Sequence, residues 1–243
     1  MVSDKEYARG SFLDGAALAA QELRRDDLPA MLERAWLEAP TMTRLRRWLG
    51  SSATKDAVQA RVGDALDACP KAALRQHALL LVLQGEITAA AKLLADAPGL
   101  GWSNGEHPGH LLFPVFTSLL SQRELPEDLP RDYDDLGLSS GDNTPKLTTP
   151  ALKSLLSLAA PPPPGADARA SILKAMRTAA EKRVSGVTEN KRRRHYGHAA
   201  SLVACCAELD RSADTTTWVA SIRSEYRRYP ALEGEFDSHL GAI

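Results

Sequence analysis

Apolar residues recur at three- and four-residue steps along most of the chain, which is the pattern of amphipathic helices. The first such stretch is Phe12–Leu23 and the second is Leu28–Glu38. Asp26 and Asp27 lie between them, where an acidic side chain is suited to cap the start of the second helix. We therefore expect these two segments to form an antiparallel helical hairpin.

Prolines interrupt this pattern three times in the first hundred residues, at Pro40, Pro70 and Pro98, which are 30 and 28 residues apart. The segments RDDLPAMLERAWLEAP and QGEITAAAKLLADAP are alike, since each is a polar turn followed by a helix that ends in a small residue and a proline. Periods of about 20 to 50 residues are typical of units that bury their apolar faces by stacking. The expected fold is all-α, with degenerate tetratricopeptide-like helical hairpins that form a solenoid.

The same patterning predicts about a dozen helices in total. The low aromatic content, 5% of residues, and the abundance of alanine and leucine also favour helices over strands. Beyond the first hairpin, the expected helices are Thr41–Leu49, Ala57–Cys69, Ala72–Leu83, Ile87–Ala97, Leu111–Leu120, Leu152–Leu158, Ala168–Arg183, Thr188–Leu209, Thr215–Tyr229 and Ala231–Leu240.

Two changes in composition divide the chain. Residues 123–150 are acidic and contain several prolines and glycines, and a run of four prolines, Pro161–Pro164, follows the short helix after them. Such segments bury little apolar surface or form stiff spacers. We interpret 1–122 as an N-terminal helical-repeat half, 123–165 as an acidic, Pro-rich linker with one short helix, and 166–243 as a C-terminal helical half.

The overall charge and the cysteines limit the class of protein. The net charge of −1 creates no global field that would recruit nucleic acid or an anionic membrane, so an electrostatic partner must be attracted by a local patch. Three cysteines, two of them adjacent, do not form the disulfide framework of a secreted domain. With no signal-peptide pattern and no long apolar run, we expect a cytoplasmic protein without a membrane partner.

The strongest local charge signal is a basic run in the second half of the chain. Several cations there are suited to neutralise phosphates or an acidic partner, and a nearby tyrosine is suited to stack on a base. The alternative is an ordinary solvated helix start, with Glu181 and Glu189 as neutralising neighbours. The candidate binding residues are Lys182, Arg183, Lys191, Arg192, Arg193, Arg194 and Tyr196.

Two His-x-x-His pairs occur, His107/His110 and His195/His198. Four such side chains would complete a tetrahedral zinc site if the two pairs met. Structural roles are favoured instead, with His107 capping a helix or bonding to the backbone, because neither pair has the His-Glu-x-x-His form of a catalytic zinc helix. No metal or other cofactor is therefore assigned.

No known catalytic signature is present in the sequence. A phosphate-cradling glycine loop, a nucleophile elbow, a kinase motif set and a Cys-x-x-Cys pair are all missing. The chain is therefore expected not to be an enzyme.

Residues 191–236, KRRRHYGHAASLVACCAELDRSADTTTWVASIRSEYRRYPALEGEF, resemble the helical segments that follow the zinc-binding motif in bacterial SWIM zinc-finger proteins. The defining Cys-x-Cys and Cys-x-His ligands of that family are absent from the chain. The resemblance implies an accessory helical scaffold without the zinc motif. It rests on Arg194, Tyr196, Ala199, Trp218, Tyr226, Pro230 and Leu232.

These observations predict a non-catalytic helical-repeat scaffold that mediates protein–protein interaction, because stacked hairpins produce a groove suited to peptides. The alternative is a nucleic-acid-associated accessory protein that binds through Lys191–Arg194. The candidate groove residues, which could equally pack into the core, are Arg44, Arg47, Trp48, Trp102 and Tyr226.

Overall fold

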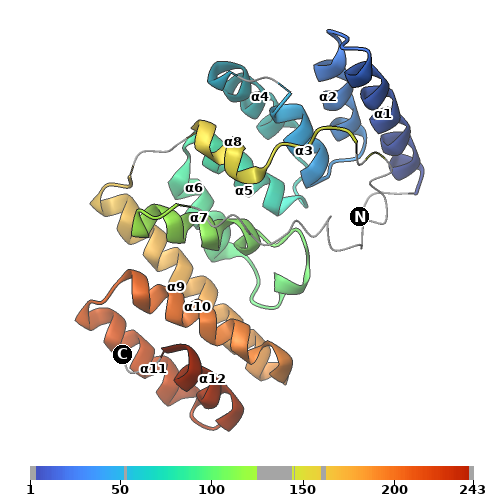
Figure 1. Cartoon of the computed structure of the whole chain (residues 1–243). Coiled ribbons are helices and arrows are strands. Elements are labelled where there is room, and N and C mark those ends of the chain that lie inside the picture. The colour runs from blue at the N-terminus through green and yellow to red at the C-terminus, as the bar shows by residue number, and fades with distance from the viewer. Residues whose placement is uncertain (1–3, 52–53, 125–143, 145, 160–162, 241–243) are drawn as a thin grey trace. The chain divides into compact units, whose positions relative to one another are not determined.

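The computed structural model describes residues 4–51, 54–124, 144, 146–159 and 163–240 of the 243-residue chain (Figure 1). Twelve α-helices and no strand lie within these residues, which confirms the all-α class. None of these helices combines the length and apolar character that a membrane span requires.

Most helices follow one another along the chain with short connections, and the longer connections lie between α6 and α7 and between α7 and α8 (Figure 1). They are α1 (Asp4–Glu22), α2 (Leu28–Glu38), α3 (Met42–Leu49), α4 (Lys55–Ala68), α5 (Leu74–Gln84), α6 (Ile87–Asp96), α7 (Gly109–Ser121), α8 (Leu152–Ala159), α9 (Ala166–Glu189), α10 (Tyr196–Leu209), α11 (Ala213–Tyr226) and α12 (Pro230–Leu240). Two short 3-10 helices are η1 (Gly101–Ser103) and η3 (Arg193–His195).

The three prolines of the repeat pattern stand where the sequence places them. Helices α2, α4 and α6 each end two residues before a proline, at Pro40, Pro70 and Pro98 respectively. The ring of a proline disfavours helical backbone at the residue before it, so the helix ends ahead of the proline. Helix α2 has the predicted bounds.

The prediction of a single helix over Thr188–Leu209 is wrong. The chain leaves α9 at Lys191, which has a left-handed φ of 52°, and the Arg192 amide donates to the Val187 carbonyl at 2.7 Å. The Lys191 amide donates to the Thr188 carbonyl at 3.1 Å, which completes a Schellman-type helix end. The basic segment is therefore a turn followed by η3, not the start of a helix.

The chain forms two compact units. The N-terminal unit comprises Met1–Glu86 and Pro126–Pro162, and the C-terminal unit comprises Ile87–Leu125 and Pro163–Ile243. This division differs from the expected boundary after residue 122, because α6 packs against α9 and α8 packs against α5. Most acidic residues of the expected linker, in 125–143, lie outside the described residues.

The N-terminal unit is built from neighbouring helices that pack in pairs, α1 on α2, α2 on α3, and α4 on α5. Trp36 and Trp48 stack with their ring centroids 5.3 Å apart, and the Trp36 indole donates to the buried Gln76 amide oxygen at 2.8 Å. Phe12, expected on the buried stripe of α1, is instead 79% exposed. The small residues Ala17 and Ala20 form the buried face of that helix.

The C-terminal unit is organised around the long helix α9, which packs against α6 and α10, while α10 also packs against α12. Gly99 is required in the turn that follows α6, because a Cβ there would lie 1.8 Å from the Lys182 carbonyl oxygen of α9. Helix α11 buries only Thr215 and Ile222. It is thus the most loosely held helix of this unit among those described, and hollows border it.

Candidate functional site

Three of the five expected groove residues lie in the core of the N-terminal unit. Arg44, Arg47 and Trp48 of α3 are each less than 5% exposed. Their side chains therefore do not line an open groove, and the alternative of core packing holds for them.

The arginines of α3 bind other parts of their own unit. Arg44 Nε and Nη2 both donate to the buried Asp14 carboxylate, at 3.0 and 2.7 Å. Arg47 Nε donates to Thr149 Oγ1 at 2.8 Å, and Arg46 donates through two nitrogens to the Pro150 carbonyl at 2.9 and 2.7 Å. These arginines thus fix α1 and residues 146–150 onto α3.

Trp102, the fourth expected groove residue, is buried in the C-terminal unit. The His107 ring stacks on it at 4.4 Å, and the rings of His110 and His198 meet it edge-on at 5.4 and 4.8 Å. The two His-x-x-His pairs therefore do converge through three of their four members. His195 instead contacts Arg194, whose Nε lies 3.2 Å from its Nε2.

Backbone groups bond both ring nitrogens of His107 and one of His110, and the Arg183 side chain bonds His198. His107 Nδ1 accepts from the Gly109 amide at 3.1 Å and its Nε2 contacts the Pro98 carbonyl at 3.3 Å, while His110 Nε2 contacts the Trp102 carbonyl at 3.0 Å. No group of three or more metal-ligating side chains occurs in the part of the chain that the structure describes. The geometry supports the structural alternative, with His107 at the start of α7.

Burial lowers the pKa of His107 to about 4, assisted by the neighbouring His110. The ring is therefore neutral at pH 7, as its two roles require, because a neutral imidazole carries one donor and one acceptor nitrogen. This cluster fastens the loop between α6 and α7.

The candidate nucleic-acid residues separate into buried and exposed sets. Arg183 and Tyr196 are buried, and Arg183 donates to the Gly99 carbonyl at 3.2 Å and to His198 Nδ1 at 3.3 Å. Lys182 is exposed but its ammonium donates to the Ala95 carbonyl at 2.6 Å. Arg183 and Tyr196 thus serve the core rather than a binding surface, which corrects the larger site expected from the sequence.

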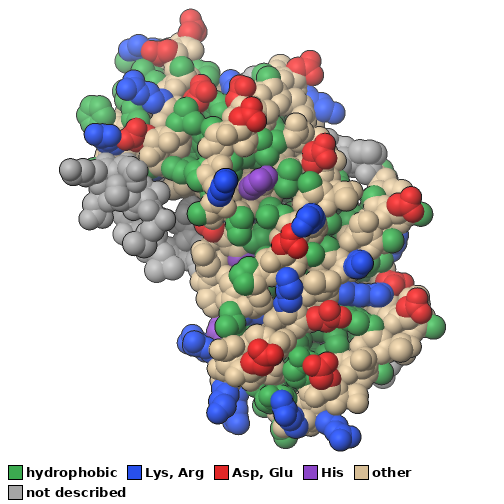
Figure 2. Space-filling model, turned by 180° about the vertical axis from the view of Figure 1, so that it is seen from behind, with side chains coloured by type: hydrophobic (Ala, Val, Ile, Leu, Met, Phe, Trp, Pro, Cys, Tyr) green, Lys and Arg blue, Asp and Glu red, His purple; other side chains and the backbone are tan. Residues whose placement is uncertain are grey.

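Lys191, Arg192, Arg193 and Arg194 form an exposed basic turn between α9 and α10. The expected neutralising partners are engaged elsewhere, since Glu189 accepts from Ser185 Oγ at 2.8 Å and Glu181 accepts from the Trp218 indole at 2.5 Å. Figure 2 shows acidic and basic side chains interspersed over the visible face rather than gathered by sign. The basic turn is therefore the candidate site for a polyanion.

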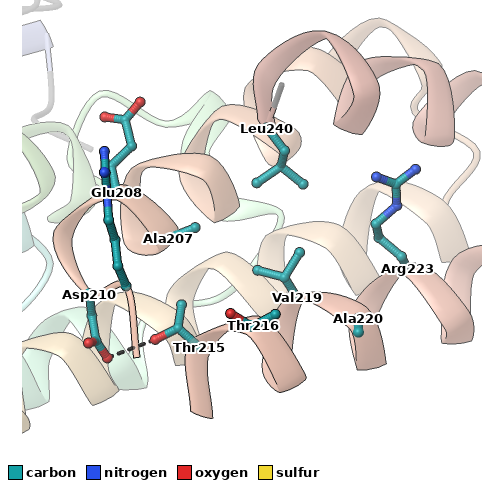
Figure 3. Close-up of a pocket in the computed structure, with 10 residues that line it drawn as sticks. Ala207, Glu208, Asp210, Thr215, Thr216, Val219, Ala220, Arg223 and Leu240 are labelled. Carbon is teal, nitrogen blue, oxygen red and sulfur yellow. Dashed lines mark hydrogen bonds between the residues drawn. The ribbon is translucent and has the colours of Figure 1, made fainter. Parts of the chain in front are cut away.

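A hollow of about 450 Å³ lies between α10, α11 and α12, and we call it the α10–α12 hollow (Figure 3). Its floor is apolar, formed by Ala207, Val219 and Leu240. The remaining lining residues are Glu208, Asp210, Arg211, Thr215, Thr216, Ala220 and Arg223.

Ion pairs fix the two ends of the α10–α12 hollow. Asp210 accepts from Arg177 at 2.6 Å and from the Thr215 hydroxyl at 2.7 Å. The hydrogen bond from Thr215, drawn in Figure 3, is the main cause that lowers the pKa of Asp210. Arg223 donates to Glu233 at 2.9 Å and to Asp237 at 2.5 Å. The hollow is thus an apolar floor between two charged ends whose geometry is set in advance.

A second hollow of about 360 Å³ lies between α9 and α11, and we call it the α9–α11 hollow. Trp218, Ile222 and Tyr226 line it at four-residue spacing, so they share one side of α11. Tyr226, the fifth expected groove residue, does therefore border an open space. The other residues that line the two hollows were not predicted from the sequence. The signal that could have indicated them is the sparse apolar stripe of α11, since a helix with few apolar residues packs incompletely against its neighbours.

No family model matches this chain, and neither a characterised protein nor a solved structure shows significant similarity to it. The resemblance to SWIM-associated helical segments stays a prediction from the residues.

Proposed function

We propose that this protein is a non-catalytic helical-repeat scaffold that binds a protein partner, with the α10–α12 hollow as the binding site. The observation that carries the proposal is a hollow bordered by apolar side chains, of which Val219 and Ala220 are the accessible ones, between charged ends that are fixed by ion pairs. Sites that accept a peptide usually combine an apolar surface with a few fixed polar groups.

The degenerate tetratricopeptide-like solenoid belongs to this proposal. Its support is the pairing of consecutive helices in the N-terminal unit, α1 with α2 and α4 with α5. The proposed compartment is the cytoplasm, and its support is that Cys69, Cys205 and Cys206 form no disulfide.

The occupant we propose is a short amphipathic segment that places aliphatic side chains on Ala207, Val219 and Leu240. Burial of one such side chain contributes about 1.5 to 3 kcal/mol, so an aliphatic pair contributes about 3 to 6 kcal/mol. The loss of motional freedom on binding costs a comparable amount, so backbone and polar contacts of the segment must supply the remainder of the affinity. Glu208 is exposed at the edge of the hollow, where it favours a basic residue beside the apolar ones.

A displayed library of random peptides tests this proposal. Peptides selected on the purified protein are expected to share a pair of aliphatic residues. Their affinity for the Ala220→Trp variant should be at least about tenfold lower than for the unmodified protein, because the introduced indole fills the hollow. Ala213→Trp is the matched control, since Ala213 is exposed on the same helix but does not line the hollow. Equal affinity for both variants would contradict the proposal.

A second candidate function is nucleic-acid association through the basic turn. It is favoured by the exposure of Lys191–Arg194 and by the engagement of Glu181 and Glu189 with other groups. Each phosphate contact releases counterions, so affinity would fall steeply between about 50 and 200 mM salt.

Fluorescence anisotropy with labelled single- and double-stranded RNA and DNA tests this second function. The triple variant Arg192→Ala, Arg193→Ala, Arg194→Ala should weaken binding and flatten its salt dependence. No binding by the unmodified protein at the lower salt concentration would exclude this function and leave the scaffold proposal.

A further inference from the structure

The wall of the α9–α11 hollow contributed by α11 is aromatic at both ends. Trp218 and Tyr226 line it on either side of Ile222, and Val184 of α9 faces them. The Trp218 indole is held in place because its Nε1 donates to Glu181 Oε1 at 2.5 Å. The aromatic rings of Trp218 and Tyr226 thus border a space of about 360 Å³.

Negative charge surrounds this aromatic wall. Glu181 and Glu225 both line the hollow and are exposed, and Glu189 lies close enough to Tyr226 to act on its phenol. Burial raises the pKa of the Tyr226 phenol, and the neighbouring Glu225 adds to that increase. The hollow therefore combines aromatic rings with carboxylates that contact neutral hydrogen-bonding groups.

Two cations close to the hollow, Lys182 and Arg177, bind other groups. Lys182 also lines the hollow, but its ammonium donates to the Ala95 carbonyl at 2.6 Å. Arg177 lies over the Trp218 ring, 5.4 Å from its centroid, and donates to Asp210. Arg177 shows that this indole already accepts a guanidinium on one face.

We infer that the α9–α11 hollow binds an arginine or lysine side chain of a protein segment. An aromatic ring attracts a cation through its quadrupole, and carboxylates add charge-assisted hydrogen bonds. Both features converge here, between Trp218 and Tyr226 and beside Glu181 and Glu225.

This inference rests on the proposed scaffold function for the nature of the partner, but it concerns a separate site. The two hollows share no lining residue, because they border different sides of α11. A partner that occupied both would place aliphatic side chains in one and a basic side chain in the other.

The test uses a fluorescein-labelled peptide, Gly-Ser-Ala-Arg-Leu-Arg-Ala-Ser-Gly, and the analogue with glutamine in place of both arginines. Anisotropy at about 50 mM salt should show binding of the arginine peptide and at least about tenfold weaker binding of the glutamine analogue. The double variant Glu181→Gln, Glu225→Gln should weaken the arginine peptide by at least about tenfold.

Two further variants make the result specific. Glu22→Gln with Glu86→Gln removes the same charge from exposed positions of the N-terminal unit and should change affinity by less than about twofold. Ser221→Lys places an ammonium in the hollow from an exposed helical position and should weaken the arginine peptide by at least about tenfold.

Three outcomes would overturn the inference. They are equal losses in the two double-glutamine variants, full binding by Ser221→Lys, and tighter binding of spermine than of the peptide. Ala220→Trp separates this site from the proposed function, since it should leave the arginine peptide bound while it abolishes binding of the library-selected peptides.

Discussion

Two arginine-rich segments of this chain have opposite fates. In α3, Arg44 and Arg47 are 4% and 2% exposed and bind Asp14 and residues of the 144–149 segment. In the turn after α9, Arg192 and Arg193 are exposed and serve no described carboxylate. The difference shows that charge density alone does not identify a binding surface, because partners distant in sequence decide whether an arginine becomes structural.

The buried ion pair gives the largest effect. Asp14→Asn leaves the Arg44 guanidinium buried beside a neutral group, so the free energy of unfolding should fall by about 3 to 5 kcal/mol in urea denaturation. The Arg9–Glu38 pair is the control, because the Arg9 side chain is 72% exposed. Arg9→Ala should cost less than about 1 kcal/mol, and equal losses would refute the structural role of the buried pair.

Stability should also depend on the protonation of His107. The folded pKa is about 4, below the ordinary value of 6.5, so the unfolded chain binds the proton more tightly. The protonation of His107 therefore leaves the free energy of unfolding unchanged above pH 6.5. It lowers that free energy as the pH falls from 6.5 to 4, by up to about 3 kcal/mol.

Urea midpoints measured across this pH range check the effect. His107→Gln should show a shallower decrease than the unmodified protein, whereas His239→Gln, at an exposed position of α12, should retain the full decrease. An unchanged slope in His107→Gln would contradict the assignment.

An intermediate effect tests how residues 146–150 are held on α3. A Cβ at Gly50 would lie 2.1 Å from the Pro150 ring, so Gly50→Ala should cost about 1 to 3 kcal/mol and speed proteolysis near Pro150. Gly63 in α4 has open space around it, and Gly63→Ala should stabilise the protein by about 0.5 to 1 kcal/mol. A loss at Gly63 equal to that at Gly50 would show that the clash is not the cause.

The smallest effect belongs to the second arginine-rich segment. Replacing Arg192, Arg193 and Arg194 with alanine should change the free energy of unfolding by less than about 0.5 kcal/mol, because these side chains are exposed. Thermal unfolding monitored by circular dichroism measures this directly. A loss comparable to that of Asp14→Asn would remove the contrast between the two segments.

The helices could be predicted from the sequence because their signals are local. Pro40, Pro70 and Pro98 end three of them, and the apolar stripe of Leu28–Glu38 gives the bounds of α2. The turn at Lys191 was missed because lysine and arginine favour helices, and no glycine marks the left-handed residue.

The division into units and the candidate sites depend on contacts between distant residues. Lys182 reaches the Ala95 carbonyl across 87 residues, and nothing in either local pattern indicates that α6 packs against α9. Likewise, Trp48 and Tyr226 look alike as isolated aromatics, but Trp48 stacks on Trp36 whereas Tyr226 borders a hollow. Tertiary packing decides such cases.

The most direct test of the scaffold proposal is an NMR titration of methyl-labelled protein with a library-selected peptide. We expect saturable shifts of the Val219 and Leu240 methyl signals, which are lost in Ala220→Trp and retained in Ala213→Trp. Saturable shifts confined to methyl groups that do not line the α10–α12 hollow would contradict it.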